Sequence, residues 1–506
     1  MLATLREMSA ADILLTRWSD ITALGSAAAV LGWDQETKMP PKGQQSRGAT
    51  LSVLAGLRHD QLTDPALADA IEQAAAAADP DSLLATQVDA ARRDVTRASA
   101  IPGDLARRMA EVQSRALGAW QQARADSDFE TFAPVLSEVI DMTTERADAL
   151  VAAGVAEHRY DALLDMYEPG ATEAELTVLL GDLRDQLSPL VKAAADSGVV
   201  IDEAPARGAF DEAAQLDLGR LVASSIGYDF DSGRLDLSAH PFTTSFGTGD
   251  VRITWRPEAD DFRPGLFGIM HEAGHGMYEQ GIPAALAGTP IGEAVSLGIH
   301  ESQSRLWENQ VGRSRAFWKW ALPHFHEAYP ASADVTIDQL FPALHTVTPS
   351  LIRVEADEAT YNLHIVARFE IERQLMAGTV EVPDLPGLWD DTYDELLGVR
   401  PTSVSDGVLQ DIHWAMGAIG YFPTYTIGNL VSAQLFDAAT EAIDDLPGRI
   451  AEGDFAPLLE WLRDNVHRHG RAQSSDELVR RATGAPLSSE PFLEYLRSTT
   501  REVYGV

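Results

Sequence analysis

The residues His271-Glu272-Ala273-Gly274-His275 constrain the fold of this chain more than any other feature. Residues four apart in a helix lie on the same face, so a helix through this stretch would bring both imidazoles to one metal ion. Glu272, between them, would then accept a proton from a water molecule held by that ion. The alternative interpretation is a pair of exposed helical histidines beside a solvated glutamate. The pattern predicts a helix that carries a metal site.

The residues on either side support such a helix. Pro264 suits a first helical turn, and Asp261 is a suitable N-cap. Gly281 and Pro283 indicate where the helix stops. Between these signals, apolar side chains recur at spacings of three and four residues: Leu266, Phe267, Met270, Ala273 and Met277. We therefore predict a buried helix over 264–280, in which two histidines are easier to explain if a metal ion binds them.

The composition limits which groups could hold that metal. The chain has 506 residues, a length that allows about three domains or one large helical body. It contains no cysteine, which excludes disulfides, thiolate metal sites and cysteine nucleophiles together. Histidine and carboxylate side chains must therefore supply the ligands.

Charge and hydropathy exclude two classes of partner. The formal net charge of −38 argues against nucleic acid, because phosphate groups would be repelled. The acidic residues are dispersed along the chain, which indicates a solvated surface. No stretch is long and apolar enough to span a membrane. The start, Met1–Glu7, lacks a basic region followed by an apolar run, so we predict no secretory signal and a cytoplasmic location.

Helical periodicity dominates the chain. Residues 1–70 predict two or three helices with a break near Met39–Gly43. Residues 71–160 carry repeated charge pairs at helical spacings, typical of long surface helices. The pattern is helical again from 290 to the end. We expect one compact catalytic domain over residues 1–506, because no fixed repeat and no long linker interrupts it.

One β region is expected, at about 235–255. The stretches Thr243–Phe246 and Val251–Trp255 flank the turn residues Gly247–Asp250, which is a hairpin signal. A small sheet directly before the metal helix could align an extended peptide through main-chain hydrogen bonds along an edge strand.

The third metal ligand is not settled by spacing. A catalytic zinc site usually has three protein ligands and leaves one position for water. Without cysteine or a third histidine nearby, the remaining ligand should be a carboxylate. Glu279 follows on the same helix, and Glu293, Glu301 and Glu308 lie on the next predicted helix. Each of these has an ordinary structural explanation as well, such as an ion pair between Glu301 and Arg305.

Further motifs resemble those of a known family. The sequence has, in order, HPF at His240–Phe242, DxRxT at Asp250–Thr254, the HEAGH stretch, HESQ at His300–Gln303, IRxxAD at Ile352–Asp357 and GxxQDxHW at Gly407–Trp414. This ordered set is similar to that of the thermostable carboxypeptidase family typified by carboxypeptidase Taq. The resemblance covers essentially the whole chain.

The resemblance implies a metal-dependent carboxypeptidase of broad specificity that releases single amino acids from short or unfolded peptides with a free C-terminus. It implies Glu301 as the third ligand, with Zn²⁺ as the cofactor and Co²⁺ as a substitute. It also implies a mainly α fold, related to angiotensin-converting-enzyme-like zinc peptidases. In that fold, residues 1–70 cover a deep groove and helices 264–280 and 291–311 bind the metal. A homodimer is expected as well.

The resemblance also suggests catalytic donors besides Glu272. Similar metallopeptidases place a His and a Tyr from a late helix and loop over the metal, which makes His413 and Tyr421 candidates for stabilising the oxyanion. Structural alternatives are a core histidine at position 413 bonded to Asp411, and a turn cap at position 421. Tyr425 is the substitute candidate for Tyr421.

Recognition of a free α-carboxylate suits an arginine, whose guanidinium binds both oxygens as a fork. The resemblance favours Arg353, with Arg252 as the second candidate. We predict that Arg353 lies on a long helix over Ser350–Ala377, where an internal ion pair with Asp357 is the structural alternative.

Two further residues are candidate substrate contacts. His240 could donate to a substrate carbonyl or fix a strand corner beside Pro241, and Gln303 could support Glu301 from behind. Asp250 and Thr254 are expected to be structural.

Two other functions remain open from sequence. An oligopeptidase or dipeptidyl carboxypeptidase would use the same zinc site, and product masses would separate it from a carboxypeptidase. A non-enzymatic peptide-binding protein with a lapsed site is the alternative of another class, and the intact base and ligands argue against it.

Overall fold

The computed structural model describes residues 8–506, and these residues form two compact units. Unit 1 contains the described part of Met1–Ser99 together with Asp202–Leu344 and Leu435–Pro486. Unit 2 contains Ala100–Ile201, His345–Gln434 and Leu487–Val506. The segment Met1–Glu7, on which the expectation of no secretory signal rests, lies outside the described residues.

Unit 1 begins with the helices predicted for residues 1–70. Helix α1 (Ala10–Thr37) starts at a capping box in which Ser9 and Asp12 each accept the other's backbone N–H. Helix α2 (Gln44–Leu62) follows after a break at Lys38–Gly43, close to the predicted one. Leu14, Trp18 and Ile21 of α1 pack into a buried cluster with side chains of the next two helices, α3 (Pro65–Ala77) and α4 (Leu83–Ala100).

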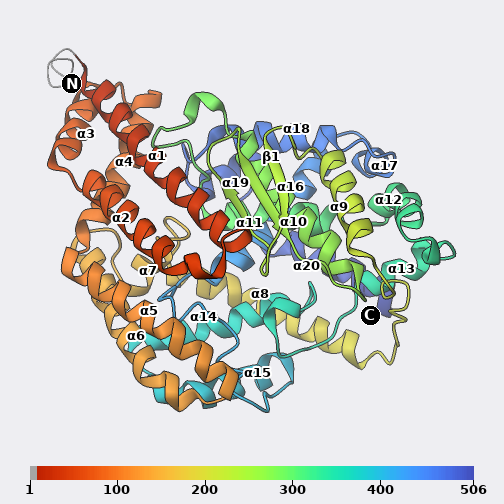
Figure 1. The fold of residues 1–506 in the computed structure, drawn as a ribbon. Helices are drawn as coiled ribbons and strands as arrows, with labels where there is room; N and C mark the ends of the chain where they lie inside the picture. Colours follow the sequence, from red (N-terminus) through yellow and green to blue (C-terminus); the bar gives the residue numbers. More distant parts are fainter. Residues whose placement is uncertain (1–7) are drawn as a thin grey trace. The chain divides into compact units, whose positions relative to one another are not determined.

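The predicted β region is a three-stranded sheet in the order β1-β3-β2. Strands β2 (Thr243–Ser245) and β3 (Val251–Trp255) form the expected antiparallel hairpin, and β1 (Gly233–Leu237) pairs with β3 in parallel. Helix α1 packs against β2, and helix α10 (Phe262–Gly281) packs against both β2 and β3. The sheet therefore lies directly beside the predicted metal helix (Figure 1).

Helix α10 confirms each local signal read from the sequence. Asp261 is its N-cap and accepts the backbone N–H of Arg263 at 2.9 Å. The predicted apolar stripe is buried along its whole length. Helix α11 (Leu297–Arg305) packs against α10 and continues into a π-helical turn at Leu306–Val311. The predicted second helix, over 291–311, thus begins six residues later than expected and contains a wider last turn.

The other helices of unit 1 surround this pair. They are α9 (Glu212–Ile226), α12 (Arg315–Ala328), α13 (Ile337–Leu344), α17 (Leu446–Ala451), α18 (Ala456–Asn465) and α19 (Ser475–Thr483). Helices α9 and α10 are in contact, as are α9 and α12.

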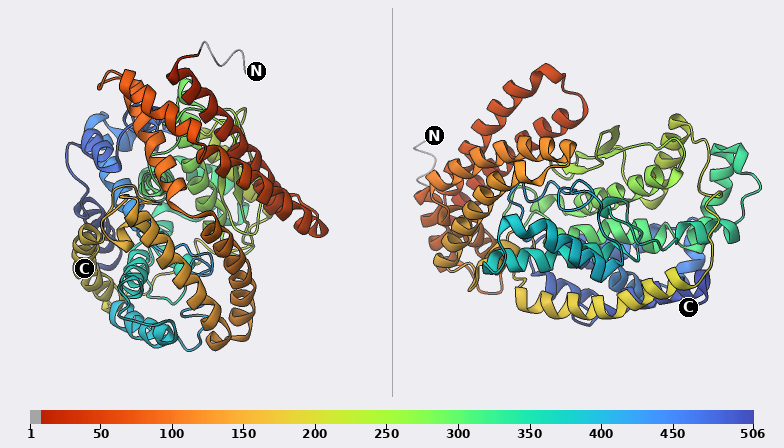
Figure 2. Two further views of the ribbon diagram at one scale, coloured as in Figure 1. Left: turned by 90° about the vertical axis from the view of Figure 1, so that its left-hand side faces the viewer. Right: turned by 90° about the horizontal axis from the view of Figure 1, so that it is seen from below.

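Unit 2 is built from helices. Helices α5 (Gly103–Asp126) and α6 (Phe129–Ala152) run side by side as a hairpin in both views of Figure 2. Helix α14 (Tyr361–Ala377) is buried on nearly every face, which makes it the central element of this unit. The remaining helices are α7 (Arg159–Leu164), α8 (Glu173–Asp196), α15 (Leu385–Leu397) and α20 (Glu490–Tyr504), and the boundary between the units falls within α16 (Pro423–Ala442).

The predicted long helix over Ser350–Ala377 is wrong. The helix begins only at Tyr361, and Arg353 lies in a single 3₁₀ turn at Arg353–Glu355. Asp357 is responsible, because its carboxylate accepts backbone N–H groups of Thr348, Ala359 and Thr360. A side chain that bonds local backbone in this way competes with the helical pattern. The membrane expectation holds: among residues 8–506, every helix is too short or too polar to cross a bilayer.

Candidate metal centre and its surroundings

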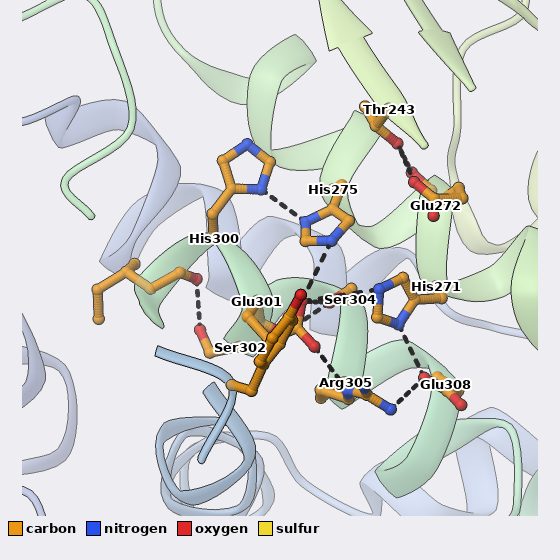
Figure 3. Close-up of polar contacts among 12 residues, drawn as sticks. Thr243, His271, Glu272, His275, His300, Glu301, Ser302, Ser304, Arg305 and Glu308 are labelled. Carbon is orange, nitrogen blue, oxygen red and sulfur yellow. Dashed lines mark hydrogen bonds and ion pairs between the residues drawn. The ribbon is translucent and has the colours of Figure 1, made fainter. Parts of the chain in front are cut away.

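Two helices bring three predicted ligands together in unit 1. His271 and His275 extend from the same face of α10, and Glu301 extends from α11. The Nε2 atoms of His271 and His275 lie 3.7 and 3.4 Å from the same oxygen, Oε2 of Glu301. One donor atom from each of the three residues fits within a span of 4.8 Å. Figure 3 shows both imidazoles directed at this carboxylate.

These separations fit a small divalent cation. Two ligands at about 2.0–2.1 Å from a tetrahedral ion are roughly 3.3 Å apart, close to the distances observed here. The donor set of two imidazoles and one carboxylate also matches catalytic zinc sites, which leave a fourth position for water. The two histidine side chains keep 18% and 15% of their surface exposed, so solvent reaches the site.

Arg305 and Glu308 hold one side of the centre. The Nε of Arg305 donates to Oε1 of Glu301 at 2.7 Å, which leaves Oε2 facing the histidines. Glu308 lies 2.8 Å from Nδ1 of His271 and also accepts from Nη1 of Arg305 at 3.1 Å. Burial opposes the ionised form of Glu301, but Arg305 and the two histidines together hold the pKa of this carboxyl well below its usual range.

The other histidine has a different partner. Nδ1 of His275 lies 2.6 Å from Nδ1 of His300, and Nε2 of His300 lies 3.0 Å from Oε1 of Glu279. The two ligands are thus held from behind by a carboxylate in one case and by an imidazole in the other. Burial lowers the pKa of His275 to about 3, so this ring is neutral, as a metal ligand must be.

The candidate base, Glu272, has its own partner on the sheet. The hydroxyl of Thr243 in β2 lies 2.6 Å from Oε2 of Glu272 and 2.9 Å from its backbone oxygen. Glu272 is 6% exposed, and burial raises the pKa of its carboxyl. A raised pKa suits a base that must accept a proton near neutral pH and release it again.

Gly274 permits the two metal helices to approach. A Cβ at this position would lie 2.5 Å from the carbonyl oxygen of Gln303 and 2.6 Å from Cα of Ser304. Both atoms are backbone, so they cannot turn aside as a flexible side chain would. The glycine inside the HEAGH stretch therefore sets how closely α11 can bring Glu301 to the histidines.

The remaining candidates for the third ligand occupy other positions. Glu279 and Glu308 lie behind the ligands, bonded to His300 and His271. The side chain of Glu293 is 52% exposed and lies 3.8 Å from Arg471. Only Glu301 directs an oxygen at both histidines among the carboxylates that spacing left open.

A second group of predicted residues meets in unit 2. Arg353 donates from Nε and Nη2 to Oδ1 of Asp411, at 3.1 and 2.7 Å. Arg368 of α14 donates to the other oxygen of Asp411 at 2.7 Å. The expected alternative, an ion pair between Arg353 and Asp357, is wrong, because Asp357 binds backbone groups instead. One buried carboxylate thus faces two buried guanidinium groups, which leaves an excess of positive charge.

His413 and the two candidate tyrosines lie in the same unit. The ring of Tyr421 is centred 5.2 Å from the imidazole of His413, and the hydroxyl of Tyr425 lies 3.4 Å from Nε2 of that imidazole. Nδ1 of His413 is 3.8 Å from Asp411, too long for the hydrogen bond considered as its structural alternative. Burial lowers the pKa of His413 to about 4, so the ring is neutral at pH 7.

Of the other residues predicted to contact substrate, two make contacts within the protein and one is exposed. Arg252 makes a two-pronged pair with Asp250, at 2.8 Å for each bond, and its guanidinium lies over the ring of Trp33. Gln303 is fully buried and lies 3.0 Å from His467, so its amide has no exposed surface. His240 is exposed in the turn between β1 and β2.

Sequence reasoning missed the residues that hold the ligands and the base. The sequence presents Glu308 as a possible ligand or an ordinary surface carboxylate, and it assigns no role to His300 or Thr243. For His300 and Thr243, position next to a motif residue is the available signal: His300 precedes Glu301, and Thr243 follows the HPF motif. Their partners are 25 and 29 residues away, so only the packing of α11 and the sheet against α10 reveals the contacts.

Comparisons with known proteins match nearly the whole chain to one family. A family model described as carboxypeptidase Taq (M32) metallopeptidase matches residues 13–500. The sequence is 43% identical over 491 residues to thermostable carboxypeptidase 1 of Thermus thermophilus, covering 95% of this chain and 96% of the relative. It is 36% identical over 488 residues to carboxypeptidase 1 of Bacillus subtilis, with 96% of each covered.

Solved structures share the fold. The crystal structure of M32 carboxypeptidase from Deinococcus radiodurans R1 matches with a TM-score of 0.94 at 41% identity, over 98% of this chain and 99% of that one. Metallocarboxypeptidase 1 of Trypanosoma cruzi matches with a TM-score of 0.93 at 33% identity, over 97% of this chain and 99% of that one.

Proposed function

Because this chain belongs to the carboxypeptidase Taq (M32) family of metallopeptidases, we propose that it is a carboxypeptidase that releases single amino acids from peptide C-termini. The observation that carries the proposal is the convergence of His271, His275 and Glu301 on one point, beside the buried carboxylate of Glu272. The family model spans nearly the whole sequence, so we treat residues 1–506 as one catalytic domain.

Zinc is the proposed metal, with cobalt as a substitute. The donor set supports either ion, since two imidazoles and a carboxylate bind both. When bound, the metal would act as a Lewis acid on the scissile carbonyl and on the attacking water. We propose His271, His275 and Glu301 as its ligands, and the bonds from Glu308 and His300 would orient the two rings.

The proton chemistry is assigned to Glu272. Its carboxylate accepts a proton from the attacking water and then delivers that proton to the leaving amine nitrogen. The raised pKa of this carboxyl makes its ionised form a stronger base and so favours the first transfer, and the hydroxyl of Thr243 fixes the orientation of the carboxylate.

The residues of unit 2 are assigned to the substrate. We propose that His413 and Tyr421 donate hydrogen bonds to the carbonyl oxygen as negative charge develops on it, with Tyr425 as the substitute for Tyr421. Arg353 is proposed to bind the terminal carboxylate, supported by the excess positive charge it shares with Arg368. Arg252 and Gln303 lack this support for direct contact with the substrate. The charge of Arg252 is balanced by its own carboxylate, Asp250, and Gln303 is fully buried.

Substrates are proposed to be short or unfolded peptides with a free C-terminus. A cytoplasmic location, a homodimer and a covering role for residues 1–70 over a deep groove complete the proposal, on resemblance alone. An exposed His240 between β1 and β2 remains a candidate contact to a substrate carbonyl.

Mass spectrometry of one unblocked peptide tests the function. The peptide is offered to the metal-loaded protein as a free acid and as a C-terminal amide. A ladder of single-residue losses from the free acid alone is the expected result. Dipeptide losses, internal cuts or equal attack on the amide would instead indicate the oligopeptidase alternative. Metal binding without hydrolysis of any peptide would indicate the non-enzymatic one.

A further inference from the structure

The segment that carries His413 and Tyr421 has no regular secondary structure. It runs from 399 to 422, between α15 and α16, and we call it the 399–422 loop. A loop of this length inside a compact unit needs side chains from outside to fix its backbone. The positions of His413 and Tyr421 therefore depend on what holds the loop.

Arg353 and Arg368 bond the adjacent loop residues Gln410 and Asp411, and further supports are donors from the α5–α6 hairpin. Nε1 of Trp120 donates to the carbonyl of Leu409 at 3.0 Å, and Nε2 of Gln113 donates to that of Met416 at 2.9 Å. Arg146 of α6 donates to the carbonyl of Gly417 at 3.1 Å. Each of these side chains holds one point of the loop.

Glu372 of α14 is different, because it holds two well-separated points of the loop at once. Its Oε1 accepts from Nε1 of Trp414 at 2.9 Å, and its Oε2 accepts from the backbone N–H of Gly420 at 2.8 Å. Trp414 directly follows His413, and Gly420 directly precedes Tyr421. The two oxygens of one carboxylate thus span the stretch that separates these two residues.

The carboxylate of Glu372 is fully buried, where an ionised group is destabilised by the loss of water. Glu372 has no exposed surface, and burial raises the pKa of its carboxyl to about 7. Its third bond comes from the hydroxyl of Tyr160 at 3.0 Å. A buried carboxylate with three donors and no bonded cation contributes little stability compared with an apolar side chain of the same size. The presence of Glu372 is better explained by the backbone conformation that it fixes between Trp414 and Gly420.

The conformation of the loop at Gly420 is unusual and closely packed. Gly420 has φ of +89°, a conformation that side chains disfavour, and a Cβ there would lie 3.0 Å from the backbone of Leu163 and Leu164. The glycine therefore fits a tight position against α7, and its N–H is turned to Glu372. Helix α14 is buried on nearly every face, so it offers a fixed base for the carboxylate.

We propose that Glu372 is a positioning residue for the reaction: it clamps the loop between Trp414 and Gly420, and so sets the relation of His413 to Tyr421. This inference rests on the proposed function, in which those two residues stabilise charge on the carbonyl oxygen. Glu372 does not touch the substrate. It acts through the loop.

The test begins with Glu372→Gln, which keeps size and shape but turns an NH₂ group towards one of the donors. We expect kcat to fall about 100-fold, as a displacement of reacting groups by roughly 1 Å does, while KM stays within about threefold. Metal content and the preference for free acid over amide should not change, because Glu372 contacts neither the ligands nor Arg353. A wild-type kcat in this variant would overturn the proposal.

Matched variants separate positioning from general stability. Trp414→Phe and Tyr160→Phe each remove one donor to the same carboxylate, but only Trp414 lies on the loop. We expect a lowered kcat for Trp414→Phe and a wild-type kcat for Tyr160→Phe. Glu370→Gln removes a carboxylate of α14 that pairs with Arg373 at the surface, and should also match the wild type. Equal losses in Trp414→Phe and Tyr160→Phe would overturn the clamp.

A double-mutant cycle tests the route of the effect. If Glu372 acts through His413, then Glu372→Gln should cost little further activity in a His413→Ala background. Full additivity would overturn the proposal. The two hypotheses fail separately: loss of single-residue release in the wild type counts against the proposed function, whereas normal release by wild type and Glu372→Gln alike counts only against the clamp.

Discussion

His275 and His300 face each other through their Nδ1 atoms, which are 2.6 Å apart. Only one of these atoms can carry the proton. His275 turns Nε2 towards Glu301, where a lone pair is needed for a metal, so its proton is on Nδ1 and it donates to His300. His300 then carries its proton on Nε2 and donates to Glu279. The chain of bonds fixes the tautomer of a metal ligand.

Removing either support should weaken metal binding. We expect His300→Ala and Glu308→Gln each to raise the dissociation constant for zinc by about 10- to 100-fold, because each leaves one ligand ring unoriented. Glu279→Gln should have a smaller effect in the same direction, since it acts through His300. Competition with a chelator measures the constant. Wild-type affinity in His300→Ala would contradict this account of the site.

Glu272→Gln should abolish turnover while metal binding is retained. The amide cannot accept a proton, and loss of a general base lowers kcat by about 100- to 10,000-fold. Initial rates on a free-acid peptide, with metal content measured on the same sample, check the prediction. Thr243→Val keeps the base but removes the hydroxyl 2.6 Å from it, so a smaller loss is expected there. Substantial activity in Glu272→Gln would exclude its role as the base.

Arg353→Ala should impair cleavage of free-acid peptides more than that of amides. Loss of charged hydrogen bonds to a carboxylate weakens free-acid cleavage by about 10- to 100-fold in kcat/KM, whereas an amide lacks that charge. Arg353→Lys keeps the charge but not the two-pronged geometry, so its kcat/KM on free-acid peptides should lie between those of the wild type and Arg353→Ala. Arg252→Ala is the control: Asp250 balances the charge of its guanidinium, so both substrates should change by the same factor. Equal losses on both substrates in Arg353→Ala would count against its role.

Gly274→Ala should separate the two metal helices. The new methyl group would meet backbone of α11 at 2.5 Å, and overpacking of this kind lowers the free energy of unfolding by about 1–3 kcal/mol. Zinc affinity should fall as well, because Glu301 moves with α11. Gly268→Ala is the matched control on the same helix, where no atom lies within 4 Å of the new methyl group. Thermal unfolding of the metal-free proteins compares them, and equal melting temperatures would contradict the prediction.

Asp411→Asn should destabilise the protein in a pH-dependent way. Burial opposes ionisation of Asp411, but Arg368 and Arg353 outweigh it and hold the pKa of this carboxyl below its usual value. A depressed pKa stabilises the fold above the unfolded value of about 3.9, and the contribution is lost as pH falls through the folded value. At pH 7 the variant leaves two guanidinium groups buried without their anion, which costs about 3–5 kcal/mol.

Urea unfolding at several pH values measures this difference. The gap between wild type and Asp411→Asn should be constant from pH 7 to about 4 and shrink below that. Glu138→Gln, which breaks an exposed pair with Arg115, should leave unfolding almost unchanged at every pH. A gap for Asp411→Asn that does not narrow in acid would show that ionisation of this carboxyl is not the cause.

Local signals were sufficient for the metal helix and the hairpin. The N-cap Asp261, the apolar stripe and the stop at Gly281 all act within one helix, so the sequence determines α10 without knowledge of its neighbours. The turn residues between β2 and β3 did the same for the hairpin. These elements follow from short-range physical chemistry.

Local sequence signals failed in two situations. In one, a side chain bonds backbone groups that would otherwise join a helix, and in the other, the contacting residue is distant in sequence. The spacing over Ser350–Ala377 predicts one helix, but the bonds from backbone N–H groups to Asp357 delay its start to Tyr361. Spacing could not choose Glu301, because four carboxylates lay in reach and only the packing of α11 on α10 separates them. Glu372 carries no motif, and its role appears only when α14 and the 399–422 loop are seen together.

The division of both units into three chain segments has a consequence for synthesis on the ribosome. The third segment of unit 1 supplies His467, which bonds Gln303 on the metal helix α11. That segment emerges only after residues 345–434 have been made, a delay on the order of 5–20 s. Unit 2 in turn needs Leu487–Val506, which are translated after the third segment of unit 1. Each unit therefore completes its set of segments only after a segment of the other unit has been synthesised, so neither can finish folding before the other has begun.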